Sequence, residues 1–220
     1  MYLYLHKDES VENKRRTKLI SEDRSDFSDH MVIKILRDYL AKKDLMVSEE
    51  ELKALKILRD KKGKPYFLFP CADESSFVNK HPIHYSVSHS GIWWGCMMAD
   101  EPVGFDMERY HDKVNHLKIA KRYFTEMEFQ YILQTGLDGF FEVWVRKEAY
   151  VKFLGSGLAN RLDSFSVVSD MQLSTVVIPI KKGDKQELPP CRIEECFIEK
   201  GLEAAYCSSS GNPIKEIVLL

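Results

Sequence analysis

Residues 140–155 read FFEVWVRKEAYVKFLG, and their apolar spacing predicts one long helix. Trp144, Glu148 and Lys152 are four residues apart, so a helix places them on a single face. Gly155 directly follows the last apolar position and is typical of a helix C-cap. The spacing therefore predicts a helix that buries one apolar stripe. Glu148 and Lys152 lie together on another face of this helix and are candidates for a functional site.

Strand-like segments lie on both sides of this helix. Short apolar runs typical of strands occupy residues 1–6, 85–88, 92–99, 103–107, 165–168, 174–180, 193–198, 204–207 and 214–220. Further helices are predicted by apolar spacing over residues 32–40 and 116–124, and by capping boxes, Ser48 with Glu51 and Thr125 with Glu128. Because the strands are short and joined by tight turns, they look mainly antiparallel. The sequence therefore predicts an α+β fold.

Bulk composition narrows the class of protein. The 220 residues carry 32 basic and 34 acidic side chains, a formal net charge of -2, which argues against nucleic acid or an anionic membrane as partner. No stretch approaches the roughly 18 consecutive apolar residues of a membrane span. Five cysteines without a C-x-x-C pattern fit reduced thiols, so we expect a cytoplasmic protein.

An acidic pair stands in one of the predicted strands. Asp106 and Glu108 are two residues apart, so both side chains leave the same face of the strand, and Phe105 and Met107 leave the other. Two neighbouring carboxylates repel each other unless a cation lies between them. Mg²⁺ is commonly held by one or two carboxylates together with phosphate oxygens. The alternative is a strand end whose acids are simply solvated.

Two further segments carry polar chemistry. Glu148 and Lys152 are one helical turn apart, which is also the spacing of an ordinary surface ion pair worth about 0.3–0.5 kcal/mol. Gly155 and Gly157 follow this helix and allow backbone to approach a ligand closely. Residues 86–91, SVSHSG, are predicted to form a turn whose hydroxyls, imidazole and amides suit a phosphate. A plain β-turn is the alternative.

The ordered set of motifs resembles the Sfp-type 4′-phosphopantetheinyl transferases, of the holo-acyl-carrier-protein synthase superfamily. The motifs are GKP at 63–65, SVSHSG at 86–91, PVGFDME at 102–108 and WVRKEAYVKFLGSGL at 144–158. The resemblance is clear from residue 63 to about residue 168. It is faint in the first 60 residues and in the last 40.

The resemblance implies an enzyme that transfers 4′-phosphopantetheine from coenzyme A to a serine of an apo acyl or peptidyl carrier protein. Adenosine 3′,5′-bisphosphate would be released in a Mg²⁺-dependent reaction. Carried over by motif, the implied metal ligands are Asp106, Glu108 and Glu148. The implied coenzyme A contacts are Lys64, Ser88, His89, Lys147 and Lys152. Glu148 and Lys152 are the expected catalytic residues, the first as general base and the second beside the leaving phosphate.

The resemblance also implies a monomer built as a pseudo-dimer, with two similar α/β halves packed together and the coenzyme between them. We expect residues 1–101 to form the N-terminal half and residues 102–220 to form the half that carries the metal ligands. Basic residues near the N-terminus should hold the 3′-phosphate. The candidates are Lys14, Arg15, Arg16, Lys18 and Arg24.

Two other functions are compatible with parts of the pattern. A metal-dependent phosphoesterase or nuclease also uses acids and a lysine, but it should carry a basic track that this chain lacks. A non-catalytic relative could bind carrier proteins without turnover. If a carrier protein binds, residues 110–122 are the expected surface, because they mix Lys113, Lys118, Lys121 and Arg122 with apolar side chains.

Overall fold

The computed structural model describes residues 1–8, 21–70, 77–78, 81–155, 162–180 and 189–220. Up to residue 101 the elements are β1 (Tyr2–Lys7), α1 (Ser21–Lys42), α2 (Glu49–Ala54), β2 (Lys56–Arg59), β3 (Pro65–Pro70), β4 (Phe77–Val78), β5 (His84–Ser90) and β6 (Trp93–Ala99). The later elements are β7 (Val103–Arg109), α3 (His116–Tyr123), α4 (Glu126–Leu154), a 3₁₀ turn (Leu162–Ser164), β8 (Phe165–Ser169), β9 (Gln172–Pro179), β10 (Arg192–Glu195), β11 (Leu202–Ser208) and β12 (Glu216–Leu219). The fold is α+β, as predicted.

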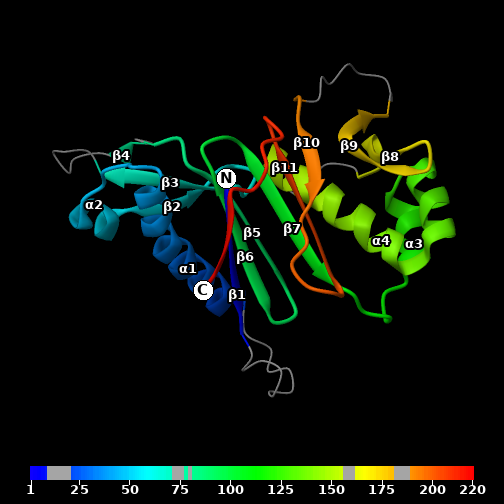
Figure 1. The fold of residues 1–220 in the computed structure, drawn as a ribbon, viewed down its shortest axis with the longest axis horizontal. Coiled ribbons are helices and arrows are strands. Elements are labelled where there is room, and N and C mark those ends of the chain that lie inside the picture. The colour runs from blue at the N-terminus through cyan, green and yellow to red at the C-terminus, as the bar shows by residue number, and fades with distance from the viewer. Residues whose placement is uncertain (9–20, 71–76, 79–80, 156–161, 181–188) are drawn as a thin grey trace.

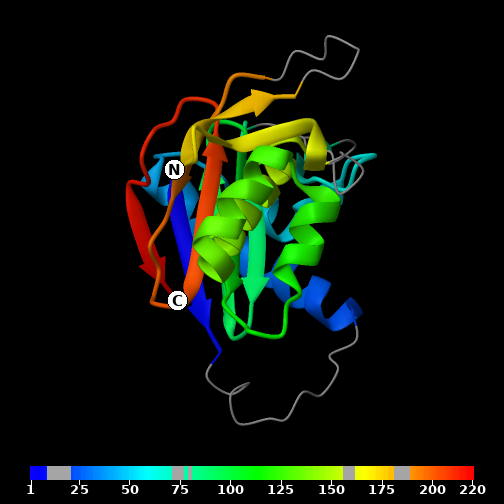
Figure 2. The same ribbon diagram turned by 90° about the vertical axis from the view of Figure 1, so that its right-hand side faces the viewer.

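Two sheets form the centre of the molecule. One has the strand order β12-β1-β6-β5 and the other has the order β10-β11-β7, while β2-β3-β4 and β8-β9 form smaller sheets. Neighbouring strands are antiparallel in every described pair except β1 with β12, which are parallel. In Figure 1, α1 lies on one side of the central strands and α4 lies on the other. Figure 2 shows α3 and α4 in front of those strands.

Three clusters of buried side chains hold these layers together. Val32, Leu36 and other residues of α1 pack on the first sheet through Tyr4 and Trp94. A second cluster lies between the two sheets, and it includes Leu3, Leu5, Met97, Phe105 and Met107. The third joins α4 to β8, β10 and β11 through side chains such as Phe140, Val151, Phe165, Ile193 and Ala205. The second sheet is therefore covered on both faces.

Local sequence signals explain the helix boundaries. Ser48 and Glu51 form the predicted capping box of α2, and Thr125 and Glu128 form that of α4. Gly155 adopts the left-handed conformation, φ 63°, that ends α4. The long helix begins earlier than the apolar pattern predicted, and its φ/ψ values are broken at Gly136, φ 72° and ψ -140°.

One local prediction is wrong. Residues 86–91 were expected to form a turn that overlapped the predicted strand at 85–88. The strand is confirmed, and it extends over all of these residues except Gly91, as β5. The turn begins at Gly91, which has φ 61°. As a consequence, alternate residues of this segment point to opposite faces, and its three serines share one face.

The four described cysteines, Cys96, Cys191, Cys196 and Cys207, are all buried free thiols. Within the described ranges, none of the helices is both long enough and apolar enough to span a membrane.

Candidate active site at the junction of β7 and α4

Strand β7 presents its two carboxylates to α4. Phe105 and Met107 point into the cluster between the sheets, so Asp106 and Glu108 point to the opposite face. Gly104 makes this approach possible, because a Cβ atom there would lie 2.0 Å from the Ala149 carbonyl oxygen of α4. Strand and helix backbones are thus in direct contact two residues before Asp106.

Serine hydroxyls hold β7 against β5. The backbone N–H groups of Phe105, Met107 and Arg109 donate to the hydroxyls of Ser86, Ser88 and Ser90, at 2.9, 3.3 and 2.9 Å. Two of these hydroxyls also orient the acids. Ser88 Oγ donates to Asp106 Oδ1 at 2.8 Å, and Ser90 Oγ donates to Glu108 Oε2 at 2.7 Å.

Helix α4 adds a cation and a third acid to this group. The Lys152 ammonium lies 2.7 Å from Asp106 Oδ1 and donates to the Val87 carbonyl at 3.1 Å. Glu148 is one turn earlier on the same face of α4. Its carboxyl lies close enough to Asp106, Glu108 and Lys152 for all three charges to influence its ionisation.

The electrostatics of the group favour a protonated acid. Burial, together with the charges of Asp106 and Glu108 and against the opposing charge of Lys152, raises the pKa of Glu148 to about 7. Burial also raises the pKa of Glu108, against the hydrogen bond from Ser90. A carboxyl that titrates near neutral pH is suited to accept and release a proton.

The donor set suits a hard divalent cation, although no group of three metal-binding side chains is assembled among the described residues. Among the residues that the structure describes, Asp106 Oδ2 and Glu148 Oε1 are buried and have no hydrogen-bond partner. Buried carboxylate oxygens of this kind are the ligands that Mg²⁺ prefers. Lys152 currently balances the charge of Asp106.

The residues expected to contact coenzyme A lie in different places. Ser88 is buried and its hydroxyl is engaged with Asp106, so it orients a carboxylate. His89 is exposed on the other face of β5. Lys64 donates to the Phe153 carbonyl at 2.7 Å, where a cation interacts favourably with the C-terminal end of α4. Burial lowers the pKa of Lys64.

Lys147 is not brought to the acidic group. Its side chain is 1% exposed, and its ammonium contacts Glu128 and two backbone carbonyls in the interior. The predicted contact with coenzyme A does not fit this placement. The N-terminal candidates for the 3′-phosphate fall outside what is described, since Lys14, Arg15, Arg16 and Lys18 lie in the range 9–20 and the side chain of Arg24 is undescribed.

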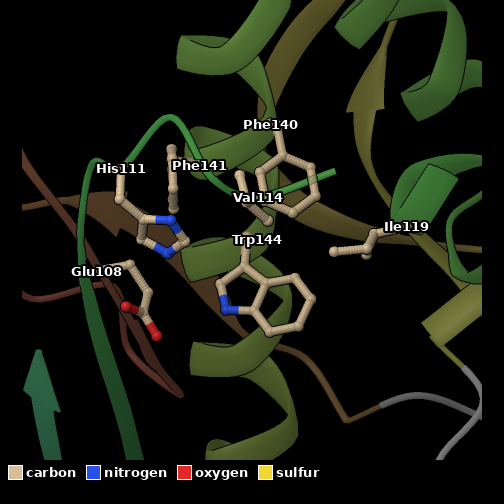
Figure 3. A pocket seen from close by; sticks show the side chains of 7 residues that line it. All are labelled: Glu108, His111, Val114, Ile119, Phe140, Phe141 and Trp144. Atoms are coloured by element: carbon tan, nitrogen blue, oxygen red, sulfur yellow. The ribbon is translucent and has the colours of Figure 1, made fainter. Parts of the chain in front are cut away.

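A small pocket of about 110 Å³ adjoins the acidic group. It is lined by Glu108, His111, Val114, Ile119, Phe140, Phe141 and Trp144. In Figure 3 the Trp144 ring, which lines the pocket, is seen between the Glu108 carboxylate and Ile119. This volume would admit roughly three or four water molecules or one small group. Glu108 is thus bordered by a largely apolar wall.

The role of Ser90 was not predicted from the sequence. Serines at positions 86, 88 and 90 have the period of two that places side chains on one face of a strand. That period is the signal that could have identified them as partners of an acidic pair with the same spacing.

Residues 102–207 match the family model of the 4′-phosphopantetheinyl transferase superfamily. The matched part of the chain contains the acidic pair, α4 and the serine-bound strand β7. The resemblance inferred from the motifs is confirmed here.

Individual relatives agree with the family match. The chain is 33% identical over 143 residues to the 4′-phosphopantetheinyl transferase Sfp of Bacillus subtilis strain 168, an alignment that covers 62% of this chain and 60% of Sfp. It is 33% identical over 130 residues to the 4′-phosphopantetheinyl transferase gsp of Aneurinibacillus migulanus, covering 57% of this chain and 52% of gsp. The chain therefore spans less than two thirds of the length of these relatives.

Proposed function

We propose that this chain transfers the 4′-phosphopantetheine group of coenzyme A to a serine hydroxyl of an apo acyl or peptidyl carrier protein. The observation that carries the proposal is that Lys152 contacts Asp106 and that the charges of Asp106, Glu108 and Lys152 all act on the ionisation of Glu148, within the matched region. The relatives carry the name of this activity. The products would be the modified carrier and adenosine 3′,5′-bisphosphate.

In this proposal Asp106, Glu108 and Glu148 would hold Mg²⁺, which would supply positive charge near the pyrophosphate of coenzyme A. The buried, unpartnered oxygens of Asp106 and Glu148 support this assignment. Ser88 and Ser90 keep two of the three carboxylates pointed toward α4.

Glu148 is the proposed general base. The carrier serine attacks the phosphorus that bears the pantetheine group, its proton passes to Glu148, and the bond to the departing phosphate breaks. Lys152 then neutralises the new charge on that phosphate or gives it a proton. Positioning and charge neutralisation are the usual requirements of phosphoryl transfer.

The remaining assignments form part of the same proposal. Lys64, Ser88, His89 and Lys152 are proposed to lie near coenzyme A, and α3 with the loop before it is proposed to contact the carrier. Lys118, Lys121 and Arg122 are exposed on this segment. A surface of this charge would suit an acidic partner. Four buried free thiols support a cytoplasmic setting, and we propose a monomer.

The two-half organisation also stays a proposal, with a boundary near residue 101. It is supported by the resemblance of arrangement on either side, where one long helix packs on an antiparallel sheet, α1 on β1-β6-β5 and α4 on β7-β11-β10. Strand β12 is an exception, because it pairs with β1.

The experiment that tests the function combines the protein with coenzyme A, Mg²⁺ and several apo carrier proteins, followed by intact-mass measurement of the carriers. We expect a carrier heavier by one phosphopantetheine. Leaving out Mg²⁺ and adding EDTA should prevent this mass increase. Binding of carriers without this mass change would favour a non-catalytic relative instead. Hydrolysis of phosphodiesters without use of coenzyme A would favour a phosphoesterase.

A further inference from the structure

Lys147 is a fully buried cation that the proposed chemistry does not use. Its ammonium donates to the carbonyls of Leu162 and Phe165, each at 2.7 Å, and lies 2.8 Å from Glu128 Oε1. The three N–H bonds of an ammonium are thus all engaged. It also lies 4.1 Å from the centre of the Phe165 ring. The surroundings hold the side chain in a single position.

Glu128 is equally buried and has several partners of its own. The Thr125 N–H donates to its Oε2 at 2.9 Å, which closes the capping box at the start of α4. The Val167 N–H of β8 donates to its Oε1 at 2.8 Å. The Lys147–Glu128 pair therefore joins the start of α4, its later part and the segment that follows the helix.

The pair bridges the break in α4. Lys147 is 19 positions after Glu128, which would separate them by roughly 28 Å in a straight helix. The two side chains are instead in contact, because the chain changes direction at Gly136. The part of α4 that carries Glu148 is thus anchored to the part that precedes Gly136.

We propose that the Lys147–Glu128 pair is a positioning device that fixes the rotation of the later part of α4, so that Glu148 faces Asp106 and Glu108. The inference rests on the proposed function, since it concerns the same three carboxylates. Successive residues of a helix point about 100° apart. Because three acceptors hold the Lys147 side chain toward the interior, the direction in which the next residue, Glu148, leaves the helix is fixed as well.

Stability alone is a weak explanation for this pair. Apolar side chains of similar volume often replace a buried ion pair without loss of stability, whereas loss of one partner leaves a buried charge uncompensated. Burial lowers the pKa of Lys147, and Glu128 opposes that shift. What apolar side chains cannot replace is the set of directional bonds that sets the helix rotation.

The test uses two variants and a matched control. Lys147→Met leaves Glu128 uncompensated, and Glu128→Gln/Lys147→Met removes both charges. Lys34→Met makes the same substitution at an exposed position of α1. Each protein is measured for thermal unfolding, for Mn²⁺ affinity by calorimetry without coenzyme A, and for transfer kinetics at a temperature where circular dichroism shows it folded.

We expect Lys147→Met to lower the melting temperature by roughly 10 °C, and the double variant to recover more than half of that loss. Both should bind Mn²⁺ about tenfold or more weakly. Both should lose about 30-fold or more in kcat, because small misplacements of reacting groups have effects of this size, while KM for coenzyme A stays within about threefold. Lys34→Met should match the wild type in every measurement.

Two kinetic results would overturn the inference. If kcat and Mn²⁺ affinity recovered together with the melting temperature in the double variant, the pair would be only structural. If Lys147→Met raised KM for coenzyme A with kcat unchanged, its ammonium would contact the coenzyme.

The metal measurement separates this inference from the proposed function. A wild type that binds Mn²⁺ but modifies no carrier would refute the transfer activity, while the Mn²⁺ affinities of the variants would still decide the positioning role. If the wild type transfers phosphopantetheine but shows no measurable Mn²⁺ binding, the kcat values of the two variants decide whether the pair has a positioning role. A wild type that does neither refutes both.

Discussion

The Lys152 ammonium lies 2.7 Å from Asp106 Oδ1, which joins α4 to β7 by a charged contact at the centre of the candidate site. Ser88 donates to the same oxygen from β5. One carboxylate therefore receives a bond from each of two neighbouring elements.

Replacement of the proposed base should affect the chemical step. Glu148→Gln keeps the size of the side chain but removes its ability to take the serine proton, so kcat should fall about 10²–10⁴-fold. Steady-state kinetics with saturating Mg²⁺ measure the effect. Near-native turnover under those conditions would remove the base role from Glu148.

The same variant should change how stability depends on pH. The folded-state pKa of Glu148 is about 7, against an ordinary value of 4.5. The folded state thus holds the Glu148 proton more tightly than the unfolded state does. The contribution of this proton to the free energy of unfolding is complete below pH 4.5, and it is lost as the pH rises through 7. Glu148→Gln should be more stable than the wild type by about 3 kcal/mol at pH 8, and equally stable near pH 4. Urea unfolding in EDTA at both pH values measures this difference.

Ser90 and Ser86 allow a matched comparison. Both accept a backbone N–H from β7, but only Ser90 also donates to a proposed metal ligand, Glu108. Ser90→Ala and Ser86→Ala should each cost about 1 kcal/mol of stability. Only Ser90→Ala should raise the Mg²⁺ concentration needed for half-maximal transfer, by about tenfold. Equal Mg²⁺ requirements in the two variants would show that Ser90 has no special role.

Gly104 should tolerate no side chain. A Cβ there would lie 2.0 Å from the Ala149 carbonyl oxygen and 2.4 Å from the Phe153 nitrogen, both backbone atoms of α4. Gly104→Ala should therefore push α4 from β7, cost about 3 kcal/mol of stability and abolish transfer. Gly63→Ala is the control, since it meets nothing within 4 Å and only strains a φ of 92°. Chemical denaturation and the carrier assay compare the two.

The proposed carrier surface can be tested by charge. Lys118→Glu with Lys121→Glu should raise KM for an acidic carrier about tenfold or more, because like charges would then face each other. KM for coenzyme A should not change. Lys34→Glu with Lys53→Glu, on exposed positions of α1 and α2, provides the control. An unchanged carrier KM would place the docking surface elsewhere.

Local signals predicted much of this fold. The capping boxes at Ser48 and Thr125 and the left-handed Gly155 lie where the sequence placed them, because each is decided by a few neighbouring residues. The spacing of Asp106 and Glu108 likewise fixed their common face. These features need no knowledge of distant contacts.

Features that depend on distant contacts were not predicted. The helical pattern of residues 140–155 did not indicate that the Lys147 ammonium would contact Glu128, 19 positions earlier, because the change of chain direction at Gly136 decides that contact. The three serines of β5 were placed in a predicted turn that overlapped the predicted strand 85–88, since serine and glycine favour turns locally. Pairing with β6 overrides this preference.

Strand β12 pairs with β1, so residues 2–7 acquire their outer neighbour from a strand roughly 200 residues later. During synthesis, that edge of β1 stays open until residues 216–219 have left the ribosome. An open edge is a template for unwanted pairing between chains. Late closure of this kind predicts that nascent or truncated chains depend on chaperones more than the finished protein does.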